Sequence, residues 1–559
     1  MGYVLKSNAK NFVNIETSDL DSISSDKVTL LHKGITSDQA TKFLHSYKEG
    51  ALKLQLNKSG EELDNFFLAI VDEASGLIEV YNDFFGNNQI FFAIEDRNLV
   101  ISDSVFNFNS EKHRVKKSSV YEVVVFQGVQ PPETIFEEVY TVPCGSYLKT
   151  NGVDYEIIEF WDIKSLLNSK EASYEKLEKE GREVLVETIK KTVGERPVTA
   201  LSGGIDSGGL LGMVTDEAGK KPATVSIGGR GPETLDLESA RKTVAFRGSE
   251  HSEIYPKYQD LSSMWEYTKG LSQPIHSSAL FSFDLIMRYA REKGYDSVVY
   301  GFGAEMLLGN LRISRVAKKV AYEKYIPNFI LRPLYRTFSG LFFKSETRQL
   351  FLSRGKDWVA RFMVVRGAHY AWQRKYFVES SERFWEDIHK KVSSNFDSEI
   401  DLYDALVILY LKSWVNYLQY RDVSAVSREI KPIMPFDSYR SAKVFFSVPT
   451  VHRMKNNWNK QLIRDIMRPY VADHLYTNPV RSLIVPYAEW FVPRREKIIS
   501  YLEKSEIVGE LFDYGMMKKR VHEEPEPGYF LMSLLGVAVW YDTNFKPERE
   551  SDFRKIFVE

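Results

Sequence analysis

The stretch TALSGGIDSGG, residues 199–209, constrains the fold more than any other part of the chain. It holds four glycines, and each glycine inside a helix costs about 1 kcal/mol relative to alanine. The apolar run PVTAL before the glycines predicts a strand, and IDSGGLLGMV predicts the start of a helix. SGG therefore falls at a strand-to-helix turn, where backbone N–H groups and the positive end of the helix dipole can bind an anion. Glycine lets the backbone approach such an anion closely.

Polar side chains of the same stretch suggest a phosphate site that uses a metal ion. Ser202 and Ser207 supply hydroxyl donors. Asp206 would repel an anion unless a cation lay between them, so we interpret it as a ligand for Mg²⁺. A tight turn with a helix cap is the simpler alternative, but S-G-G-I-D-S directly after an apolar strand favours the anion site. The Walker loop is excluded here, because no Gly-Lys-Ser or Gly-Lys-Thr follows.

Length and composition limit the number of domains and the kind of protein only broadly. The 559 residues exceed what one compact core usually holds, which predicts two or more domains. A single cysteine argues against a disulfide framework or a cysteine-rich metal site and fits a reducing compartment. The longest apolar run, residues 529–541, is too short to cross a bilayer and predicts a buried helix. We expect a cytoplasmic protein with no transmembrane segment and no nucleic-acid partner.

The secondary-structure pattern changes near residue 165. Short apolar and β-branched runs predict strands at residues 66–72, 77–83, 89–96, 99–103, 120–126 and 145–150. Helical spacing appears at residues 173–193, and strands then alternate with helices up to about residue 300. That alternation predicts a parallel sheet with crossover helices. Beyond about residue 310 the pattern is mainly helical.

Several motifs resemble those of the asparagine synthetase superfamily. SGGIDS resembles the pyrophosphate-binding signature of the ATP pyrophosphatases. YGFGAEMLLGN (300–310) is similar to the family's SGEGxDELFGG, MPFD (434–437) to its PFLD, and NKQLIRDIM (459–467) to the segment with its K-x-x-L-R. LDNFFLAIVDEASGLIEVYNDFFGNNQIFF and PPETIFEEVYTVPCGSYL resemble the family's glutaminase domain. The resemblance implies an α+β, Ntn-hydrolase-like, β-rich domain over residues 1–165. It also implies an α/β ATP-pyrophosphatase (PP-loop) domain with a parallel sheet and helical additions over 166–559.

The resemblance also implies a set of site residues for ATP and Mg²⁺. Asp206 and Glu305 would be the metal pair, and Lys460 would be the catalytic lysine of K-x-x-L-R. The nucleotide would contact three segments, namely Leu201, Ser202, Gly203, Gly204, Ile205, Asp206 and Ser207, then Val225, Ser226, Ile227 and Gly228, and finally Tyr300, Gly301, Phe302 and Gly303. His251 falls in a further matching segment and is better interpreted as a residue that fixes a loop.

Two departures from the family pattern bear on the chemistry. The family's glutaminase nucleophile is a cysteine directly after the initiator methionine, and this chain has Gly2 there; its one cysteine is Cys144. Without a thiolate we expect no glutamine hydrolysis. In the second motif, Phe302 replaces the family's glutamate, Glu305 replaces its aspartate, and Met306 replaces its next glutamate. This pattern resembles β-lactam synthetases and lasso-peptide macrolactam synthetases more than asparagine synthetase itself.

The sequence defines the general base, and the cation that would stabilise the charged transition state, less well. Glu429 and Asp422 are candidates for the base, although a helix-end or surface salt bridge is the simpler interpretation of each. Arg481, in NPVRSLIVPY, stands where the family has a lysine that stabilises the charged transition state.

The sequence thus predicts an ATP-dependent ligase that adenylates a carboxylate, releases pyrophosphate and lets an amine displace AMP. One alternative is an ammonia-dependent asparagine synthetase, which the loss of two acidic residues at 302 and 306 disfavours. A second is a non-catalytic nucleotide-binding scaffold, which the intact SGGIDS disfavours. A tRNA-thiolating enzyme is a weaker alternative, because that chemistry usually relies on cysteines.

Residues 311–380 form a basic, aromatic segment with 15 Lys and Arg against 4 Asp and Glu. A solvated helical cover is one interpretation. The other is a docking surface for a large or anionic substrate, such as a precursor peptide, a carrier protein or an anionic glycan. Arg332, Arg336 and Lys344 are the residues through which we would test it.

Overall fold

A computed structural model of the chain defines the fold. The structure describes residues 3–8, 11–17, 20–59, 63, 66–86, 88–96, 98–109, 113–126, 128–152, 154–162, 164–166, 173–275, 279–308, 430–448, 454–455, 458–477, 485–523 and 528–558.

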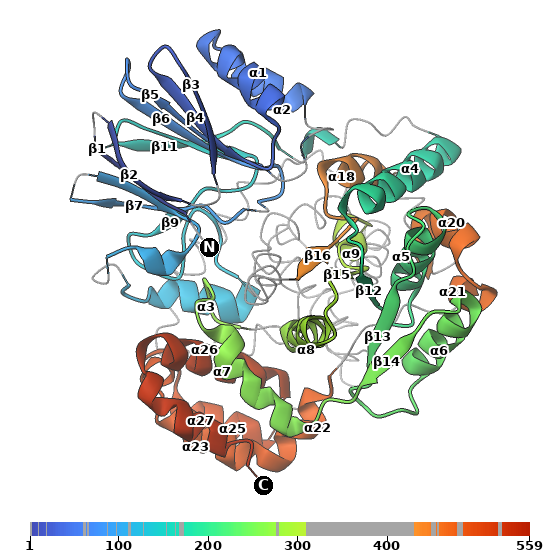
Figure 1. The fold of residues 1–559 in the computed structure, drawn as a ribbon. Helices are drawn as coiled ribbons and strands as arrows, with labels where there is room; N and C mark the ends of the chain where they lie inside the picture. Colours follow the sequence, from blue (N-terminus) through green and yellow to red (C-terminus); the bar gives the residue numbers. More distant parts are fainter. Residues whose placement is uncertain are drawn as a thin grey trace, which may run out of the picture.

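Two antiparallel sheets pack face to face in the N-terminal part (Figure 1). One sheet has the order β2-β1-β8-β7-β9 and the other β11-β10-β6-β5-β4-β3. Apolar side chains that alternate along the strands fill the space between the sheets, including Phe67, Val80 and Phe92. The strands are β1 (Tyr3–Asn8), β2 (Asn11–Thr17), β3 (Asp21–Ser25), β4 (Val28–Lys33), β5 (Phe67–Asp72), β6 (Leu77–Asn82), β7 (Phe91–Glu95), β8 (Asn98–Ser102), β9 (Tyr140–Thr141), β10 (Ser146–Thr150) and β11 (Tyr155–Glu159).

Helices cover the outer faces of this sandwich. The helix α1 (Ser37–Lys48) packs on β3 and β4 and is followed by α2 (Leu52–Lys58). Thr36 caps α1 in a capping box with Gln39. The strand expected at 120–126 is wrong, because these residues form the helix α3 (Lys117–Phe126). A short apolar run fits a buried strand and a buried helix equally well, and here packing against α26 (Gly528–Phe545) decides in favour of the helix.

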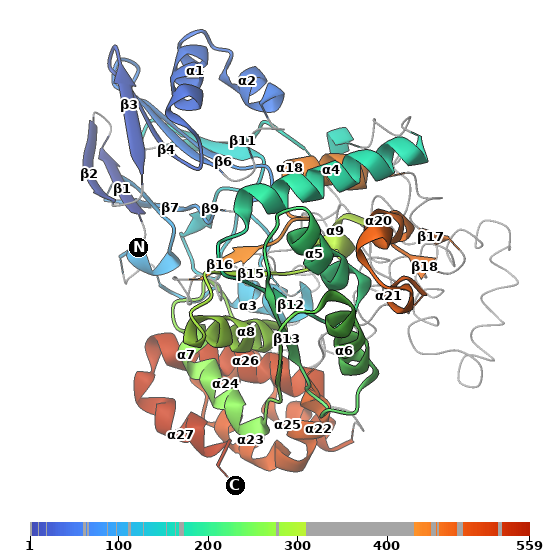
Figure 2. The same ribbon diagram turned by 45° about the vertical axis from the view of Figure 1, so that its right-hand side comes forward.

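A five-stranded parallel sheet forms the centre of the second part of the chain (Figure 2). Its strand order is β14-β13-β12-β15-β16, so the order reverses between β12 and β15. The strands are β12 (Pro197–Ala200), β13 (Ala223–Ile227), β14 (His251–Ile254), β15 (Ser297–Val299) and β16 (Lys431–Ile433). The crossover helices are α5 (Ile205–Asp216), α6 (Leu235–Arg247) and α8 (Ala279–Glu292), and α4 (Tyr174–Thr192) precedes the sheet. The predicted parallel sheet and the helix expected at 173–193 are confirmed.

Helices complete the described part of the chain. The short helices α7 (Met264–Thr268) and α9 (Ala304–Leu308) flank α8 and β15 in sequence. After β16 come α18 (Tyr439–Phe446), the hairpin of β17 (Met454–Lys455) and β18 (Trp458–Asn459), α20 (Gln461–Met467), α21 (Asp473–Thr477), α22 (Tyr487–Phe491), α23 (Arg495–Glu503), α24 (Glu506–Leu511), α25 (Tyr514–Glu523), α26 and α27 (Glu550–Lys555).

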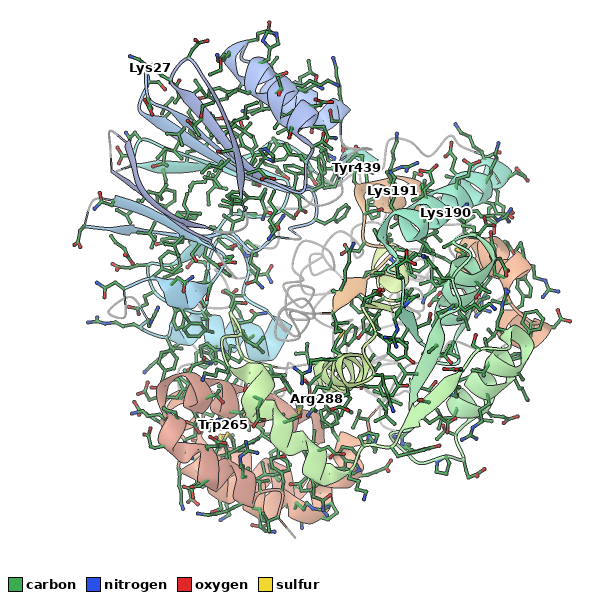
Figure 3. All side chains as sticks on the ribbon, viewed as in Figure 1. Lys27, Lys190, Lys191, Trp265, Arg288 and Tyr439 are labelled. Atoms are coloured by element: carbon green, nitrogen blue, oxygen red, sulfur yellow. The ribbon has the colours of Figure 1, made fainter. Side chains whose placement is uncertain are left out.

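The C-terminal helices build a core of their own around α26. The helix expected over residues 529–541 is confirmed, because it lies within α26, where Leu531, Leu534 and Trp540 are fully buried. Trp265 of α7 packs among these helices, with its ring 5.6 Å from that of Phe553 (Figure 3). Across the described residues, none of the helices has both the length and the apolar character that a membrane span requires.

Candidate nucleotide-binding site

Three loops meet at the carboxyl edge of the parallel sheet. They are Leu201–Gly204 after β12, the turn at Gly228 after β13, and Tyr300–Gly303 after β15. In open parallel sheets, ligands bind outside the carboxyl ends of the strands, at the point where the strand order reverses. That point lies between β12 and β15, so the predicted segments 201–207 and 300–303 flank the expected ligand crevice.

The SGG turn is held in shape by its own polar groups and by α6. Gly203 has φ +72°, and a Cβ atom there would lie 2.2 Å from the carbonyl oxygen of Asp236. The backbone N–H of Ser202 donates to Oγ of Ser207 at 3.1 Å, and the two hydroxyls are also 3.1 Å apart. Only glycine fits at position 203, because both the left-handed backbone and the contact with α6 exclude a side chain.

The N-terminus of α5 offers donors for an anion. Gly204 is its N-cap residue and provides no side-chain cap. The first intrahelical bond runs from the N–H of Gly208 to the carbonyl of Gly204, so the N–H groups of residues 205–207 have no partner within the helix. These groups and the helix dipole favour negative charge at this end of α5.

The loop after β15 closes over this helix end. A Cβ atom on Gly301 would lie 3.0 Å from the backbone nitrogen of Ser207 and 3.1 Å from Cβ of Asp206. The absence of a side chain at position 301 therefore allows the two motifs to touch. The structure brings together segments that lie about a hundred residues apart in the sequence.

Lys460 completes the site from a distant part of the chain. Its Nζ donates to Oδ2 of Asp206 at 2.7 Å, and its side chain is only 2% exposed. It precedes α20 and has φ +58°, an uncommon conformation for a residue with a side chain. The predicted catalytic residue Lys460 thus lies at the predicted metal ligand Asp206.

Arg464 lies one helical turn after Lys460 and is also buried. Its Nη1 donates to the carbonyl oxygen of Tyr476 at 2.7 Å. Burial lowers the pKa of its guanidinium, and the negative charge of nearby Asp206 opposes that shift. Two cations of the K-x-x-L-R segment therefore lie close to the N-terminus of α5, with Asp206 and Asp465 as the nearby carboxylates.

Asp206 fits a role in holding Mg²⁺. Among the residues that the structure describes, its Oδ1 is buried and accepts no hydrogen bond, whereas Oδ2 is bonded to Lys460. Mg²⁺ is usually held by one or two carboxylates together with substrate phosphates, so one available oxygen at this helix end fits that chemistry. Glu305 lies in α9, two residues after Gly303, and its side chain lies outside the described atoms. No cluster of three or more His, Cys, Asp or Glu side chains occurs within the described ranges.

The polar groups at the end of β13 mostly bond within the protein, so this segment would contribute to the site mainly through its packing. The N–H of Leu201 donates to the carbonyl of Val225, and Oγ of Ser226 donates to the carbonyl of Leu201 at 2.6 Å. The N–H of Gly228 donates to Ile254. A Cβ atom on Gly228 would lie 2.6 Å from the ring of Tyr255, so the aromatic ring closely covers this turn.

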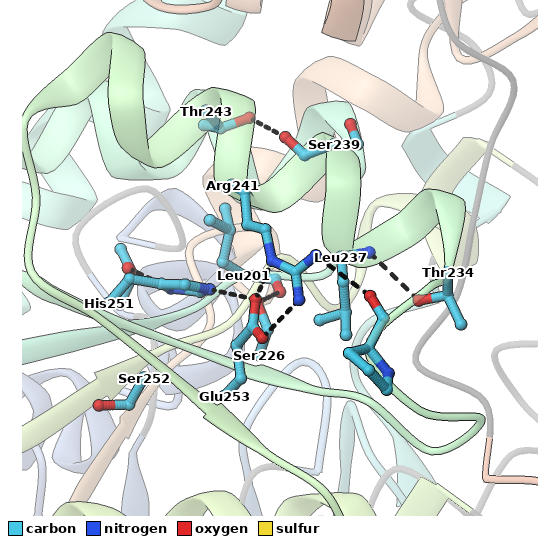
Figure 4. A network of polar contacts seen from close by, with 12 residues as sticks. Leu201, Ser226, Thr234, Leu237, Ser239, Arg241, Thr243, His251, Ser252 and Glu253 are labelled. Carbon is cyan, nitrogen blue, oxygen red and sulfur yellow. Dashed lines mark hydrogen bonds and ion pairs between the residues drawn. The ribbon is translucent and has the colours of Figure 1, made fainter.

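A polar network on α6 and β14 fixes the edge of the sheet next to this turn (Figure 4). Arg241 forms two hydrogen bonds to the carboxylate of Glu253, at 2.7 and 2.8 Å. Nδ1 of His251 lies 2.8 Å from Oγ1 of Thr224, and burial lowers the pKa of this histidine while Glu253 opposes the shift. These contacts support the interpretation of His251 as a residue that fixes the local structure.

Tyr255 is a residue that the sequence-based interpretation missed. Its hydroxyl accepts from Arg241 at 3.2 Å, and its side chain is 42% exposed beside the turn at Gly228. An exposed aromatic ring at the end of a strand is a weak signal on its own, since single exposed apolar residues are common.

Aromatic rings surround the loop after β15. Tyr300 stacks on Phe283 of α8 with ring centroids 4.5 Å apart, and Phe302 meets the same ring edge-on at 6.0 Å. Phe302 is partly buried. Where the related motif has a glutamate, this protein therefore has an apolar ring that packs on α8 and cannot transfer a proton.

Three glycines of α5 allow close packing of helices and do not belong to the anion-binding turn. A Cβ atom at Gly208 would lie 2.3 Å from Leu475, one at Gly209 would lie 2.2 Å from Sδ of Met467, and one at Gly212 would lie 2.7 Å from Cβ of Tyr470. These positions lie inside the helix and face α20, α21 and the turn Arg468–Tyr470 between them. The glycines let these helices approach α5 closely, so only Gly203 and Gly204 belong to the turn itself.

Other predicted residues lie outside the described part of the chain. These are Glu429, Asp422 and Arg481, together with the basic segment 311–380, Gly2, and the side chains of Glu305 and Met306. Their assigned roles stay predictions. Cys144 lies in the N-terminal part, with its Cβ 3.3 Å from where a Cβ atom on Gly86 would be.

A parallel sheet with a glycine turn, an uncapped helix N-terminus and an acidic residue at its strand-order reversal defines an α/β nucleotide-binding domain. The asparagine synthase family matches residues 180–542, which is more than half of the chain. The protein therefore belongs to the asparagine synthase family, whose members form amides in an ATP-dependent reaction.

Two solved structures are similar to this chain at low identity. One is glutamine phosphoribosylpyrophosphate amidotransferase from B. subtilis in complex with ADP and GMP, at 11% identity, covering 54% of this chain and 75% of that chain with a TM-score of 0.17. The other is described as the allosteric regulatory enzyme of purine biosynthesis, at 11% identity, covering 50% of this chain and 70% of that chain with a TM-score of 0.16. Scores this low carry no argument about function. No curated protein sequence matched.

Proposed function

We propose that this protein uses ATP and Mg²⁺ to adenylate a substrate carboxylate, releases pyrophosphate, and lets an amine displace AMP to form an amide. The observation that carries the proposal is the contact between Lys460 and Asp206 at the N-terminus of α5, with Oδ1 of Asp206 available. This places positive charge, helix-end donors and one carboxylate oxygen at the strand-order reversal. Those are the groups that a triphosphate with a bound metal ion requires.

The roles of the residues follow from their positions. The N–H groups at the start of α5, with Ser202 and Ser207, bind phosphate oxygens. Lys460 balances negative charge that increases as pyrophosphate leaves. Asp206, with Glu305 as the proposed second ligand, would hold Mg²⁺, which would supply further charge stabilisation at the phosphates.

The proposed chemistry has two bond exchanges. A carboxylate oxygen of the substrate attacks the α-phosphorus, and the bond between that phosphorus and the bridging oxygen breaks to release pyrophosphate. The nitrogen of the amine then attacks the acyl carbon, the bond to AMP breaks, and the amine gives up a proton. Phe302 cannot accept this proton, so Glu429 and Asp422 remain the proposed bases.

The reaction would run without glutamine hydrolysis. The related glutaminases use a cysteine thiolate as nucleophile, and the one cysteine of this sequence, Cys144, lies just before β10. We therefore propose that the amine comes from a second substrate, or from the same substrate as the carboxylate, as in lactam-forming relatives.

Replacement of Asp206 tests the proposal. Asp206→Asn keeps the shape but removes the charge, so we expect loss of pyrophosphate release by at least about a hundredfold. Asp216→Asn is the matched control, because Asp216 lies in the last turn of the same helix and bonds Arg247 at the surface. Equal activity of Asp206→Asn and wild type would reject the assigned role.

An ammonia-dependent asparagine synthetase is the second candidate, and the family match is compatible with it as well as with the first. It differs in its substrates, since it would convert aspartate and ammonium to asparagine. Turnover of this pair at a rate above that of other acids and amines would replace the proposed function with this one. Absence of Mg-ATP binding would instead support a non-catalytic scaffold.

We also propose that the basic segment 311–380 docks a large or anionic substrate. Its 15 basic against 4 acidic residues support this, and ATP needs no such surface. Changing Arg332, Arg336 and Lys344 together to Glu should weaken substrate affinity, and added salt should weaken the wild type in the same way, because exposed charges are screened within about 10 Å at 0.1 M salt. Unchanged affinity for the substrate would reject the docking role.

A further inference from the structure

An aromatic contact joins the N-terminal part of the protein to α18, the helix that follows β16. Tyr439 is the first residue of α18, and its ring lies 4.5 Å from that of Phe84 and 5.6 Å from that of Trp161, measured between centroids. Phe84 and Trp161 are buried, and their own rings meet edge-on at 5.2 Å. Figure 3 shows Tyr439 where α18 faces the N-terminal sheets.

On the N-terminal side of this contact, hydrogen bonds fix the turn that carries Phe84. Phe84 follows β6, and the fully buried carboxylate of Asp83 holds the turn by accepting from the N–H groups of Phe85 at 2.8 Å and Asn88 at 3.2 Å. The backbone carbonyl of Asp83 also accepts from Gly145 at 2.8 Å. Phe84 is therefore held in place by a network that involves no residue of the nucleotide site.

The other side of the contact leads directly to the nucleotide site. Ser438 caps α18 by accepting from the N–H of Ser441 at 3.0 Å, and the hydroxyl of Ser441 donates to the carbonyl of Pro435 at 2.8 Å. These bonds fix residues 435–441 as one unit. Within that unit, the Cβ atom of Phe436 would lie 2.9 Å from a Cβ atom on Gly303.

The chain of contacts thus runs from Phe84 through Tyr439 and Phe436 to Gly303. Gly303 belongs to the loop that places Gly301 against Asp206 and Ser207. Each step is a close packing contact or a short turn fixed by hydrogen bonds, and close-packed contacts transmit strain, so we expect a shift of Tyr439 to move the loop.

We infer that Phe84 and Trp161 are positioning residues for the nucleotide site, and that the N-terminal domain serves to hold the 300–303 loop against the start of α5 through Tyr439. This inference rests on the proposed function, because it requires that the loop binds nucleotide. It gives the N-terminal domain a role in ATP binding that does not require catalysis by that domain.

The test measures binding of Mg²⁺ with α,β-methylene-ATP by calorimetry, because this probe needs no knowledge of the acyl substrate. Phe84→Leu and Tyr439→Leu should each weaken binding by about tenfold, a coupling of ordinary size between two sites. The double variant should bind about as weakly as either single variant, because both changes break the same contact. Tyr439→Phe, which keeps the ring that meets Phe84 and Trp161, should bind within about twofold of wild type.

A matched control separates positioning from general loss of stability. Phe92→Leu also shortens a fully buried phenylalanine of the N-terminal part, but Phe92 lies between the two sheets and packs on Tyr140 and Tyr155. It should lower the melting temperature about as much as Phe84→Leu and leave binding within about twofold of wild type. Equal binding by Phe84→Leu and wild type, or equal weakening by Phe92→Leu, would overturn the inference while leaving the proposed function intact. Failure of wild type to bind the probe would overturn both.

Discussion

Lys460 lies with its Nζ 2.7 Å from Oδ2 of Asp206, although 254 residues separate them in the sequence. The lysine is 2% exposed and the aspartate 19% exposed, so water screens this ion pair only weakly. The buried ammonium of Lys460 offers a counter-charge for phosphate, and the second oxygen of the partly buried Asp206 carboxylate offers a position for a metal ion.

The first prediction concerns the strength of this pair. Lys460→Met should remove the cation that is hydrogen-bonded to Asp206 and leave only the more distant Arg464, so the free energy of unfolding in urea should fall by about 2 kcal/mol. Adding Asp206→Asn to Lys460→Met should recover part of this loss, giving a coupling energy of at least about 1 kcal/mol in a double-mutant cycle.

The exposed pair between Lys190 and Glu217 provides the control. Its atoms are 3.4 Å apart and both side chains are at least a third exposed, so the same cycle should give less than about 0.5 kcal/mol. A coupling energy below about 0.5 kcal/mol for Lys460 and Asp206 would show that this pair stabilises the fold no more than an exposed ion pair does.

The second prediction separates glycines needed for packing from glycines that only weaken a helix. Gly209→Ala should destabilise the protein by about 1 to 3 kcal/mol, because its Cβ atom would overlap Met467. Gly509→Ala should stabilise it by up to about 1 kcal/mol, because a Cβ atom at this exposed position in α24 meets nothing within 4 Å. Urea unfolding of both variants measures the difference. Equal effects of the two substitutions would contradict the packing role of Gly209.

The third prediction follows from the raised pKa of Asp284. Burial raises the pKa of this carboxyl to about 6, although Arg288 and Ser263 oppose the shift. A carboxyl with a raised pKa in the folded state contributes stability that is fully present below its unfolded value of 3.8 and is lost as the pH rises through about 6. Between pH 7 and pH 5 this group alone should therefore add about 1 kcal/mol of stability on acidification.

Comparison with Asp284→Asn isolates this contribution. Histidines with lowered pKa, such as His251, act in the opposite direction, but they are present in both proteins and cancel. The change in unfolding free energy between pH 7 and pH 5 should be about 1 kcal/mol less favourable in the variant than in wild type. An identical pH dependence in the two proteins would show that Asp284 titrates normally.

The turn at residues 201–207 could be predicted from sequence because its signal is local. A strand, two glycines and a helix start are adjacent in the chain, and the structure forms them as expected. The contact of Asp206 with Lys460 could not be predicted from spacing, since it depends on how α20 packs on α5; only the resemblance to K-x-x-L-R pointed to Lys460. The same packing explains Gly208 and Gly209, which sequence alone would assign to anion binding.

One element was predicted wrongly, and one contact was not predicted at all, each for a physical reason. The β-branched run at 120–126 predicts a strand by propensity, but burial of α3 against α26 overrides that preference. The contact of Phe84 with Tyr439 joins two unremarkable aromatic residues from distant segments, and no sequence pattern marks either of them.

The central claim is adenylation, and the identity of the nucleotide products tests it most directly. Purified protein would be incubated with Mg-ATP and a panel of carboxylates and amines, and the nucleotides and phosphates would be separated and quantified, with Asp206→Asn as the inactive control. We expect AMP and pyrophosphate in equal amounts, matched by the new amide and independent of glutamine. ADP and inorganic phosphate as the products would contradict it.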